Sequence, residues 1–200
     1  DVMYVYQEPQ LGTGHAAKIV SEALENLEFS GPVLLSTGDK HIEESAIEAL
    51  VDGFVKQQAD MAMLTIPKTK ATEGSVGRVF VDREGQAMDI IERTDRQRLA
   101  IADELRDKLA RSKEITPDNL RMIIEKQIPG PAKQEKAVGE LLALAGRSSV
   151  VDPRKLTEVL ESPNYNLTID GKRYSARQIE KLCTGTNPSL YMFTAEVFRK

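Results

Sequence analysis

Residues 31–39 of this 200-residue chain read Gly-Pro-Val-Leu-Leu-Ser-Thr-Gly-Asp, and they are the strongest indication of its fold class. Its residues 32–37 are an apolar run between two glycines, which predicts a short strand buried on both faces. Residues 61–66 predict a second apolar strand, and the segment between the two strands carries apolar residues at helical spacing: Ile47, Leu50, Val51, Phe54 and Val55. Strands that alternate with helices predict a mostly parallel sheet with crossover helices.

The same alternation continues on both sides of this stretch. Residues 2–6 predict a strand, and a helical pattern begins at Gly14. Residues 77–82 and 86–92 predict an antiparallel hairpin, and residues 189–193 predict a last strand, with a helix from about Thr194. The fold class we expect is therefore α/β, with a Rossmann-like, mostly parallel sheet that has helices on both faces.

The segment between the hairpin and the last strand differs from the rest of the chain. It is charged, rich in helical patterns and interrupted by prolines. Thr116-Pro117 and Asp152-Pro153 predict helix starts, Asp170-Gly171 predicts a hairpin turn, and Ser175 opens a capping box. We expect three parts: a partial core at residues 1–96, a mainly helical insertion at residues 97–186, and a return to the core sheet at residues 187–200.

Composition excludes several classes of protein. Acidic residues outnumber basic ones by 31 to 27, and the net charge of −4 argues against a nucleic-acid partner. No run approaches the roughly 20 apolar residues of a membrane helix, and no signal peptide is visible, so we expect a cytoplasmic protein without a membrane partner. One cysteine and two histidines exclude a disulfide framework and a Cys/His zinc site. Because residue 1 leads directly into a predicted strand without an initiator Met, we expect a fragment.

Three segments carry candidate chemistry. In residues 7–16, Gln-Glu-Pro-Gln-Leu-Gly-Thr-Gly-His-Ala, the glycines around Thr13 allow the backbone to approach a flat ligand, although a simple helix-entry turn is an equal alternative. Asp39 follows the buried strand, where a carboxylate can hold a cation and its phosphates; its alternative role is to cap a turn before the next helix. Glu92 also ends an apolar strand, and the alternative there is a solvated edge charge.

The order of these motifs resembles the sugar-1-phosphate nucleotidyltransferase family, and is most similar to the uridylyltransferase domain of bifunctional N-acetylglucosamine-1-phosphate uridyltransferases. The motifs are Leu-Gly-Thr-Gly-His-Ala at 11–16, strand-Gly-Asp at 38–39, Gly-Arg-Val at 77–79, Ile-Ile-Glu at 90–92 and Asn-x-x-Leu-Tyr-Met-Phe at 187–193. The resemblance covers residues 2–95 and 187–200, and it does not explain the insertion. It implies a sheet of the nucleotide-diphospho-sugar transferase type.

The resemblance also implies the reaction and the residues that serve it. The reaction is nucleotidyl transfer from a nucleoside triphosphate, UTP, to N-acetylglucosamine 1-phosphate, with release of pyrophosphate and with Mg²⁺ as cofactor. Homo-oligomer formation stays open. By position in the motifs, the nucleotide is held by Gln7, Gly12, Thr13 and Gly38; the metal and the catalytic step by Asp39; and the sugar by Gly77, Glu92 and Asn187. His15 is expected to fix the loop by hydrogen bonding.

Departures from the family pattern keep two other functions open. The family's Gly-rich loop with Arg and a downstream Pro-Lys is absent from these residues, and Lys40, His41 and Thr94 replace residues usual in the family. We therefore expect an incomplete catalytic domain that is inactive alone. The alternatives are a non-catalytic regulatory or scaffold protein on the same fold, and a nucleotidyltransferase that uses another base, such as CTP.

Overall fold

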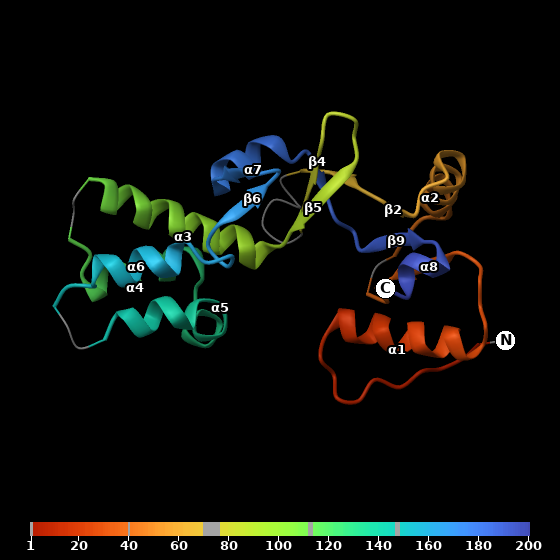
Figure 1. Ribbon diagram of the computed structural model, residues 1–200, viewed down its shortest axis with the longest axis horizontal. Coiled ribbons are helices and arrows are strands. Elements are labelled where there is room, and N and C mark those ends of the chain that lie inside the picture. The colour runs from red at the N-terminus through yellow and green to blue at the C-terminus, as the bar shows by residue number, and fades with distance from the viewer. Residues whose placement is uncertain (1, 40, 70–76, 112–113, 147–148) are drawn as a thin grey trace. The chain divides into compact units, whose positions relative to one another are not determined.

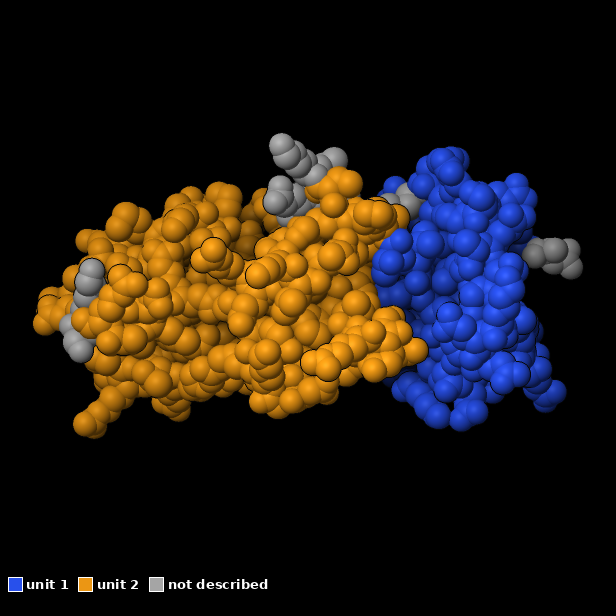
Figure 2. Space-filling model, turned by 90° about the horizontal axis from the view of Figure 1, so that it is seen from above, with its two compact units in different colours: residues 1–65, 188–200 blue, residues 66–187 orange. Residues whose placement is uncertain are grey.

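A computed structural model describes residues 2–39, 41–69, 77–111, 114–146 and 149–200 of the chain (Figure 1). Lys40, one of the departures noted above, lies outside the described residues. The chain divides into two compact units: unit 1 comprises residues 1–65 and 188–200, and unit 2 comprises residues 66–187 (Figure 2). The division expected from the sequence, at 96/97 and 186/187, is not tested by these contacts and stays a prediction.

Unit 1 contains a three-stranded sheet with the strand order β1-β9-β2. Its elements are α1 (Thr13–Asn26), β1 (Val33–Ser36), α2 (Glu44–Gln57), β2 (Met61–Met63), β9 (Leu190–Phe193) and α8 (Ala195–Phe198). The small core forms where Leu50 and Phe54 of α2 pack with Leu190 and Met192 of β9. The helical stripe expected at residues 47–55 and the strand expected at 189–193 are confirmed.

The strand pairings described here are antiparallel, so the mostly parallel sheet expected from the sequence is not confirmed. β9 pairs antiparallel with both β1 and β2, and β1 and β2 therefore point in the same direction with β9 between them. The alternation of strands and helices correctly indicates that β1 and β2 share a direction. The alternation does not indicate that β9, from the far end of the sequence, lies between β1 and β2 and forms hydrogen bonds with both.

Two further expectations for unit 1 are wrong. Residues 2–6 form no strand, and the Tyr4 side chain is 92% exposed. β-Branched and aromatic residues favour a strand only where a neighbouring strand and a packing surface receive them, and residues 2–6 pair with no other described segment. β1 is a strand as expected but is not buried on both faces, since its residues alternate between intermediate and exposed and Leu34 is 43% exposed.

The main core of unit 2 is helical. Its helices are α3 (Arg93–Ala110), α4 (Pro117–Gln127), α5 (Pro131–Leu144) and α6 (Pro153–Leu160), which contact one another in pairs (Figure 1). The expected helix starts are confirmed: Thr116 Oγ1 accepts a hydrogen bond from the Asn119 N–H at 3.2 Å, and Asp152 Oδ1 accepts one from Arg154 at 2.9 Å. The fully buried side chains of this core include Ile101, Leu105, Leu120, Ile124, Leu141, Leu156 and Leu160.

A four-stranded sheet with the order β3-β8-β4-β5 adjoins this core within unit 2. The strands are β3 (Ile66–Pro67), β4 (Arg78–Val81), β5 (Ala87–Ile91) and β8 (Gly185–Thr186). The expected hairpin of β4 and β5 is confirmed, with Arg78 opposite Ile91. A second hairpin joins β6 (Leu167–Ile169) to β7 (Lys172–Tyr174), and α7 (Ala176–Leu182) follows it. Ile179 of α7 and the adjacent Cys183 are buried together with Ile91 of β5.

No helix in the described part of the chain has the length and apolar character needed to cross a membrane.

Candidate functional site

The loop before α1 is held by the side chain of Gln7. Gln7 Nε2 donates a hydrogen bond to the carbonyl of Gly12 at 2.9 Å and lies 3.1 Å from Nδ1 of His15. Gly12 has a φ of +102°, a conformation that L side chains rarely adopt, so the loop requires glycine there. The expectation that His15 fixes the loop by hydrogen bonding agrees with this contact, and Gln7 has a structural role in the loop whether or not it touches a ligand.

Thr13 is the first residue of α1 and is exposed. Because the N-cap residue is Gly12, it offers no side chain to cap the helix, and α1 has no side-chain cap hydrogen bond. The first N–H groups of a helix have no acceptor within the helix. The loop and the first turn of α1 therefore present backbone donors and the Thr13 hydroxyl at an exposed surface, which suits the polar edge of a flat ligand.

Gly38 and Asp39 form an exposed turn directly after β1. The next helix, α2, begins at Glu44 and has Glu43 as its N-cap, so Asp39 is not the cap of that helix. The hydroxyl of Thr37, the residue before this turn, is buried and has no hydrogen-bond partner among the described residues. A buried hydroxyl without a partner costs free energy, and a polar ligand at the turn would relieve that cost.

The turn at Asp39 could hold a magnesium ion only if the substrate supplied further oxygen ligands. Among the described residues, no group of three or more His, Cys, Asp or Glu side chains is placed to hold a metal. Mg²⁺ in phosphate-transfer sites takes one or two carboxylates and fills its other positions with water and phosphate oxygens. A single exposed carboxylate is compatible with that mode of binding, and the metal remains a prediction.

The structure brings together the three residues expected to contact the sugar. Arg78 of β4 lies opposite Ile91 of β5 and opposite Thr186 of β8. The residues one step beyond each of these, Gly77, Glu92 and Asn187, consequently lie at the same end of three neighbouring strands. Two contacts confirm their proximity: the Asn187 N–H donates to the Gly77 carbonyl at 3.1 Å, and a Cβ added to Gly77 would lie only 2.9 Å from Oε1 of Glu92.

Glu92 also has a structural role, as the N-cap of α3. Its side chain accepts from the Asp95 N–H, while Asp95 Oδ2 accepts from the Glu92 N–H at 3.3 Å, and the two form a reciprocal capping box. Glu92 is exposed, whereas Asn187 is 7% exposed and Gly77 is buried. The site thus combines one accessible carboxylate, fixed by a helix start, with a nearly buried amide.

The predicted site residues form groups that lie in different units. Gln7, Gly12 and Thr13 share the loop before α1, and Gly38 and Asp39 form a second turn; both belong to unit 1. The three residues expected to contact the sugar belong to unit 2.

Sequence reasoning missed a partly buried charge cluster around Glu180 of α7. Arg78 Nε lies 3.3 Å from the Glu180 carboxylate and Lys68 Nζ lies 3.4 Å from it, while Arg96 Nη1 forms an ion pair with its Oε1. Burial raises the pKa of Glu180, but the hydrogen bond from Arg96 and the charges of Arg78, Arg96 and Lys68 outweigh it and hold the pKa below its ordinary value. Arg78 is fully buried. The partners are far apart in the sequence and share no motif, so no sequence signal identifies them.

The lone cysteine, Cys183, is a buried residue that follows the end of α7. Burial raises the pKa of the Cys183 thiol to about 11, and the charge of Glu180 adds to that shift. Cys183 is 2% exposed, which agrees with a small apolar core residue and not with a reactive thiol.

The sequence of about half of this chain is homologous to a sugar-1-phosphate nucleotidyltransferase region, the class that the motifs indicate. The curated relatives are proteins named bifunctional protein GlmU. That of Synechococcus sp. (strain CC9902) is 40% identical over 93 residues, which cover 46% of this chain and 20% of the relative. The protein from Paraburkholderia xenovorans (strain LB400) is 37% identical over 106 residues, or 52% of this chain and 22% of the relative.

The similarity is partial. A third relative, from Geotalea daltonii, is 34% identical over 96 residues, and the chain spans about a fifth of the length of these curated relatives. No family model matches the chain, and no solved structure is significantly similar to it.

Proposed function

We propose that this chain binds UTP and N-acetylglucosamine 1-phosphate for nucleotidyl transfer that releases pyrophosphate. The observation that carries the proposal is the convergence of Gly77, Glu92 and Asn187 at the ends of three neighbouring strands. These residues come from separate motifs, and the last is distant from the others in the sequence. The similarity to GlmU proteins over about half of the chain supports the same class of reaction.

In the proposed reaction, a phosphate oxygen of the sugar 1-phosphate forms a bond to the α-phosphorus of UTP. The bond from that phosphorus to the oxygen bridging the α- and β-phosphates breaks, and pyrophosphate leaves with the electron pair. Such transfer depends on positioning and charge neutralisation more than on acid–base catalysis. Mg²⁺ held by Asp39 would neutralise charge on the phosphate oxygens.

Different residues bind the base, the ribose and the sugar. The exposed amides of the Gly12 loop and the Thr13 hydroxyl bind the edge of the base, and Gln7 keeps the loop in shape. Gly38 lies against the ribose, where the absence of a side chain leaves room. The Glu92 carboxylate accepts from sugar hydroxyls, and Asn187 fixes the backbone of Gly77 beside it.

We also propose a fold family for the chain and an incomplete catalytic domain. β1, α2 and β2 keep the common strand direction of a Rossmann-like unit, which supports membership of a nucleotide-diphospho-sugar transferase fold with β9 inserted between the strands. The Gly-rich triphosphate loop is absent from the 200 residues, so we propose that they form an incomplete catalytic domain. Binding is therefore the better first readout.

Isothermal calorimetry with UTP, CTP and N-acetylglucosamine 1-phosphate tests the proposal. We expect UTP to bind more tightly than CTP. Thr13→Val should weaken UTP about tenfold, which corresponds to the loss of one hydrogen bond. Thr157→Val is the matched control, since the Thr157 hydroxyl donates to its own helix in α6. Equal or tighter binding of CTP would favour the enzyme that uses another base, and no binding of either nucleotide would favour the scaffold alternative.

A further inference from the structure

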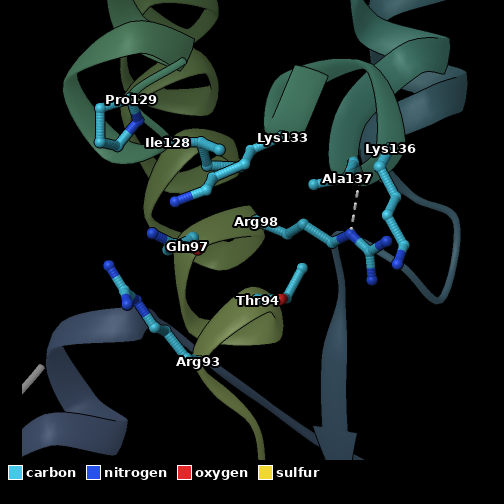
Figure 3. Close-up of a pocket in the computed structure, with 9 residues that line it drawn as sticks. All are labelled: Arg93, Thr94, Gln97, Arg98, Ile128, Pro129, Lys133, Lys136 and Ala137. Atoms are coloured by element: carbon cyan, nitrogen blue, oxygen red, sulfur yellow. Dashed lines mark hydrogen bonds between the residues drawn. The ribbon is translucent and has the colours of Figure 1, made fainter. Parts of the chain in front are cut away.

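A strongly basic pocket lies inside unit 2, between the first turns of α3 and the first turns of α5 (Figure 3). Its volume is about 360 Å³. Four of the residues that line it are cationic, Arg93, Arg98, Lys133 and Lys136, and none of its nine lining residues in the described part of the chain is acidic. None of them is a residue assigned above to the nucleotide, the metal or the sugar.

Helical spacing places the two lysines on one side of the pocket wall. Lys133 and Lys136 are three residues apart on α5 and so share one face of that helix. α5 begins at Pro131 after Gly130, whose φ of +96° requires glycine. The helix that follows this turn contacts α4 and α3, and its Lys133 and Lys136 line the same pocket.

Hydrogen bonds to backbone carbonyls hold the walls in place. Gln97 Nε2 donates to the Gln127 carbonyl at 2.6 Å, and Gln134 Nε2 donates to the Ile128 carbonyl at 3.0 Å. Arg98 Nε donates to the Ala137 carbonyl at 2.8 Å, the bond drawn in Figure 3. Ile128, which lines the pocket, is 3% exposed and belongs to the helical core. The pocket is therefore built from packed helices.

The positive charge of the pocket is largely uncompensated. Arg98 has one acidic neighbour, since its Nη1 lies 3.4 Å from Oδ1 of Asp95. Among the described residues, Arg93, Lys133 and Lys136 take part in no ion pair. Like charges held together cost free energy, and a bound anion removes that cost. In Figure 3, Arg98 and Lys136 lie toward one side of the view and Arg93, Gln97 and Lys133 toward the other, with the Thr94 hydroxyl between them.

We propose that this pocket binds a compact anion of the diphosphate class. The cations form two separated pairs, Arg98 with Lys136 and Arg93 with Lys133. Two pairs match two linked phosphate groups better than a single carboxylate or phosphate, which would leave one pair unneutralised. Thr94 and Gln97 offer a hydroxyl and an amide for the oxygens between the cations. The volume leaves room for a small group attached to the diphosphate.

Calorimetry on the whole chain with inorganic pyrophosphate, without Mg²⁺ and at about 0.15 M salt, tests the proposal. We expect saturable binding at least about tenfold tighter than that of inorganic phosphate. Lys133→Gln with Lys136→Gln should weaken pyrophosphate about tenfold or more. The matched control is Lys155→Gln with Lys181→Gln, which removes the same charge from exposed positions outside the pocket. An equal loss in the control, or no saturable binding by the unmodified chain, would overturn the proposal.

One further variant separates this pocket from the proposed reaction site. Asp39→Asn alters the residue assigned to the metal and should leave pyrophosphate affinity unchanged. A loss of pyrophosphate binding in Asp39→Asn would assign the anion to the reaction site and contradict a separate pocket. Because Lys133 and Lys136 are exposed, their double variant should melt within about a degree of the unmodified chain when no anion is present. A large drop in melting temperature would instead assign both lysines to the fold.

Discussion

Gly77 and Glu92 are the clearest case of two residues whose roles depend on each other. A Cβ on Gly77 would lie 2.9 Å from Oε1 and 3.2 Å from Cδ of Glu92, so Gly77→Ala must displace that carboxylate. Since Glu92 is exposed, its side chain can move, and we expect a stability loss of only about 1 kcal/mol. Affinity for N-acetylglucosamine 1-phosphate should fall about tenfold, as measured by calorimetry.

Gly53→Ala is the matched control for that substitution, because an added Cβ at Gly53, within α2, meets no atom within 4 Å. It should leave the affinity for the sugar phosphate unchanged. Unchanged affinity in Gly77→Ala would remove Glu92 from the proposed sugar site.

Asp39 is the residue on which the proposed chemistry depends most directly. In the full-length protein, Asp39→Asn should lower the rate of nucleotidyl transfer on the order of 10³-fold. This is equivalent to several kcal/mol of lost transition-state stabilisation. The melting temperature should change little, because Asp39 is exposed and does not occupy the N-cap position of α2, which is Glu43. Near-normal turnover measured beside an unchanged melting curve would end the metal hypothesis.

Glu180 predicts a pH dependence of stability with a definite sign. Its pKa is lowered in the folded protein, so its stabilising contribution is complete above the unfolded-state pKa of about 4.3 and is lost as pH falls through the lower folded pKa. Urea unfolding at about pH 6 and about pH 3 should show a smaller pH-dependent loss in Glu180→Gln than in the unmodified chain. Glu158→Gln, an exposed control on α6, should behave as the unmodified chain does, and equal pH dependence in all three would contradict the assignment.

At the scale of elements, local signals in the sequence predicted most of the helices. Thr116, Asp152 and Ser175 cap helices where their side chains and the following residues indicated. The Asp170-Gly171 turn has positive φ at both residues, 50° and 72°, as a two-residue hairpin turn requires. These features depend only on neighbours in the sequence, which is why they can be predicted from one sequence.

Features that depend on distant segments could not be predicted in the same way. The position of β9 between β1 and β2 changes the sheet from parallel to antiparallel pairing, and no residue near β1 encodes it. The cluster around Glu180 also joins segments that share no motif. The convergence of Gly77, Glu92 and Asn187 could be anticipated only because the family resemblance assigns all three to one ligand.

The capping box of α7 provides a test at this scale. Ser175 Oγ accepts from the Gln178 N–H at 3.2 Å, and Gln178 Oε1 accepts from the Ser175 N–H at 2.8 Å. Ser175→Ala should cost about 1 kcal/mol in the free energy of unfolding. Chemical denaturation measures it, with Ser30→Ala as an exposed control outside α7. A cost no larger than that of the control would mean that the cap does not stabilise α7.

At the scale of the whole molecule, the two units differ in how much core they contain. The core formed by α3 to α6 includes many fully buried side chains, whereas α1 has only Ser21 among its buried residues. Backbone amides open more readily where few apolar contacts hold them. Amide hydrogen exchange should therefore be slower in α3, α4 and α6 than in α1. Equal protection in α1 would contradict this inference from burial.

Over about half of its length the chain is similar to GlmU proteins, and we propose that unit 1 binds the nucleotide and unit 2 binds the sugar phosphate. Amide chemical shifts, followed by NMR during separate titrations with UTP and with N-acetylglucosamine 1-phosphate, test it most directly. We expect UTP to shift the amides of Gly12, Thr13 and Gly38, and the sugar phosphate to shift those of Gly77, Glu92 and Asn187. Saturating ligand that leaves both sets unmoved, or that moves only residues elsewhere, would contradict it.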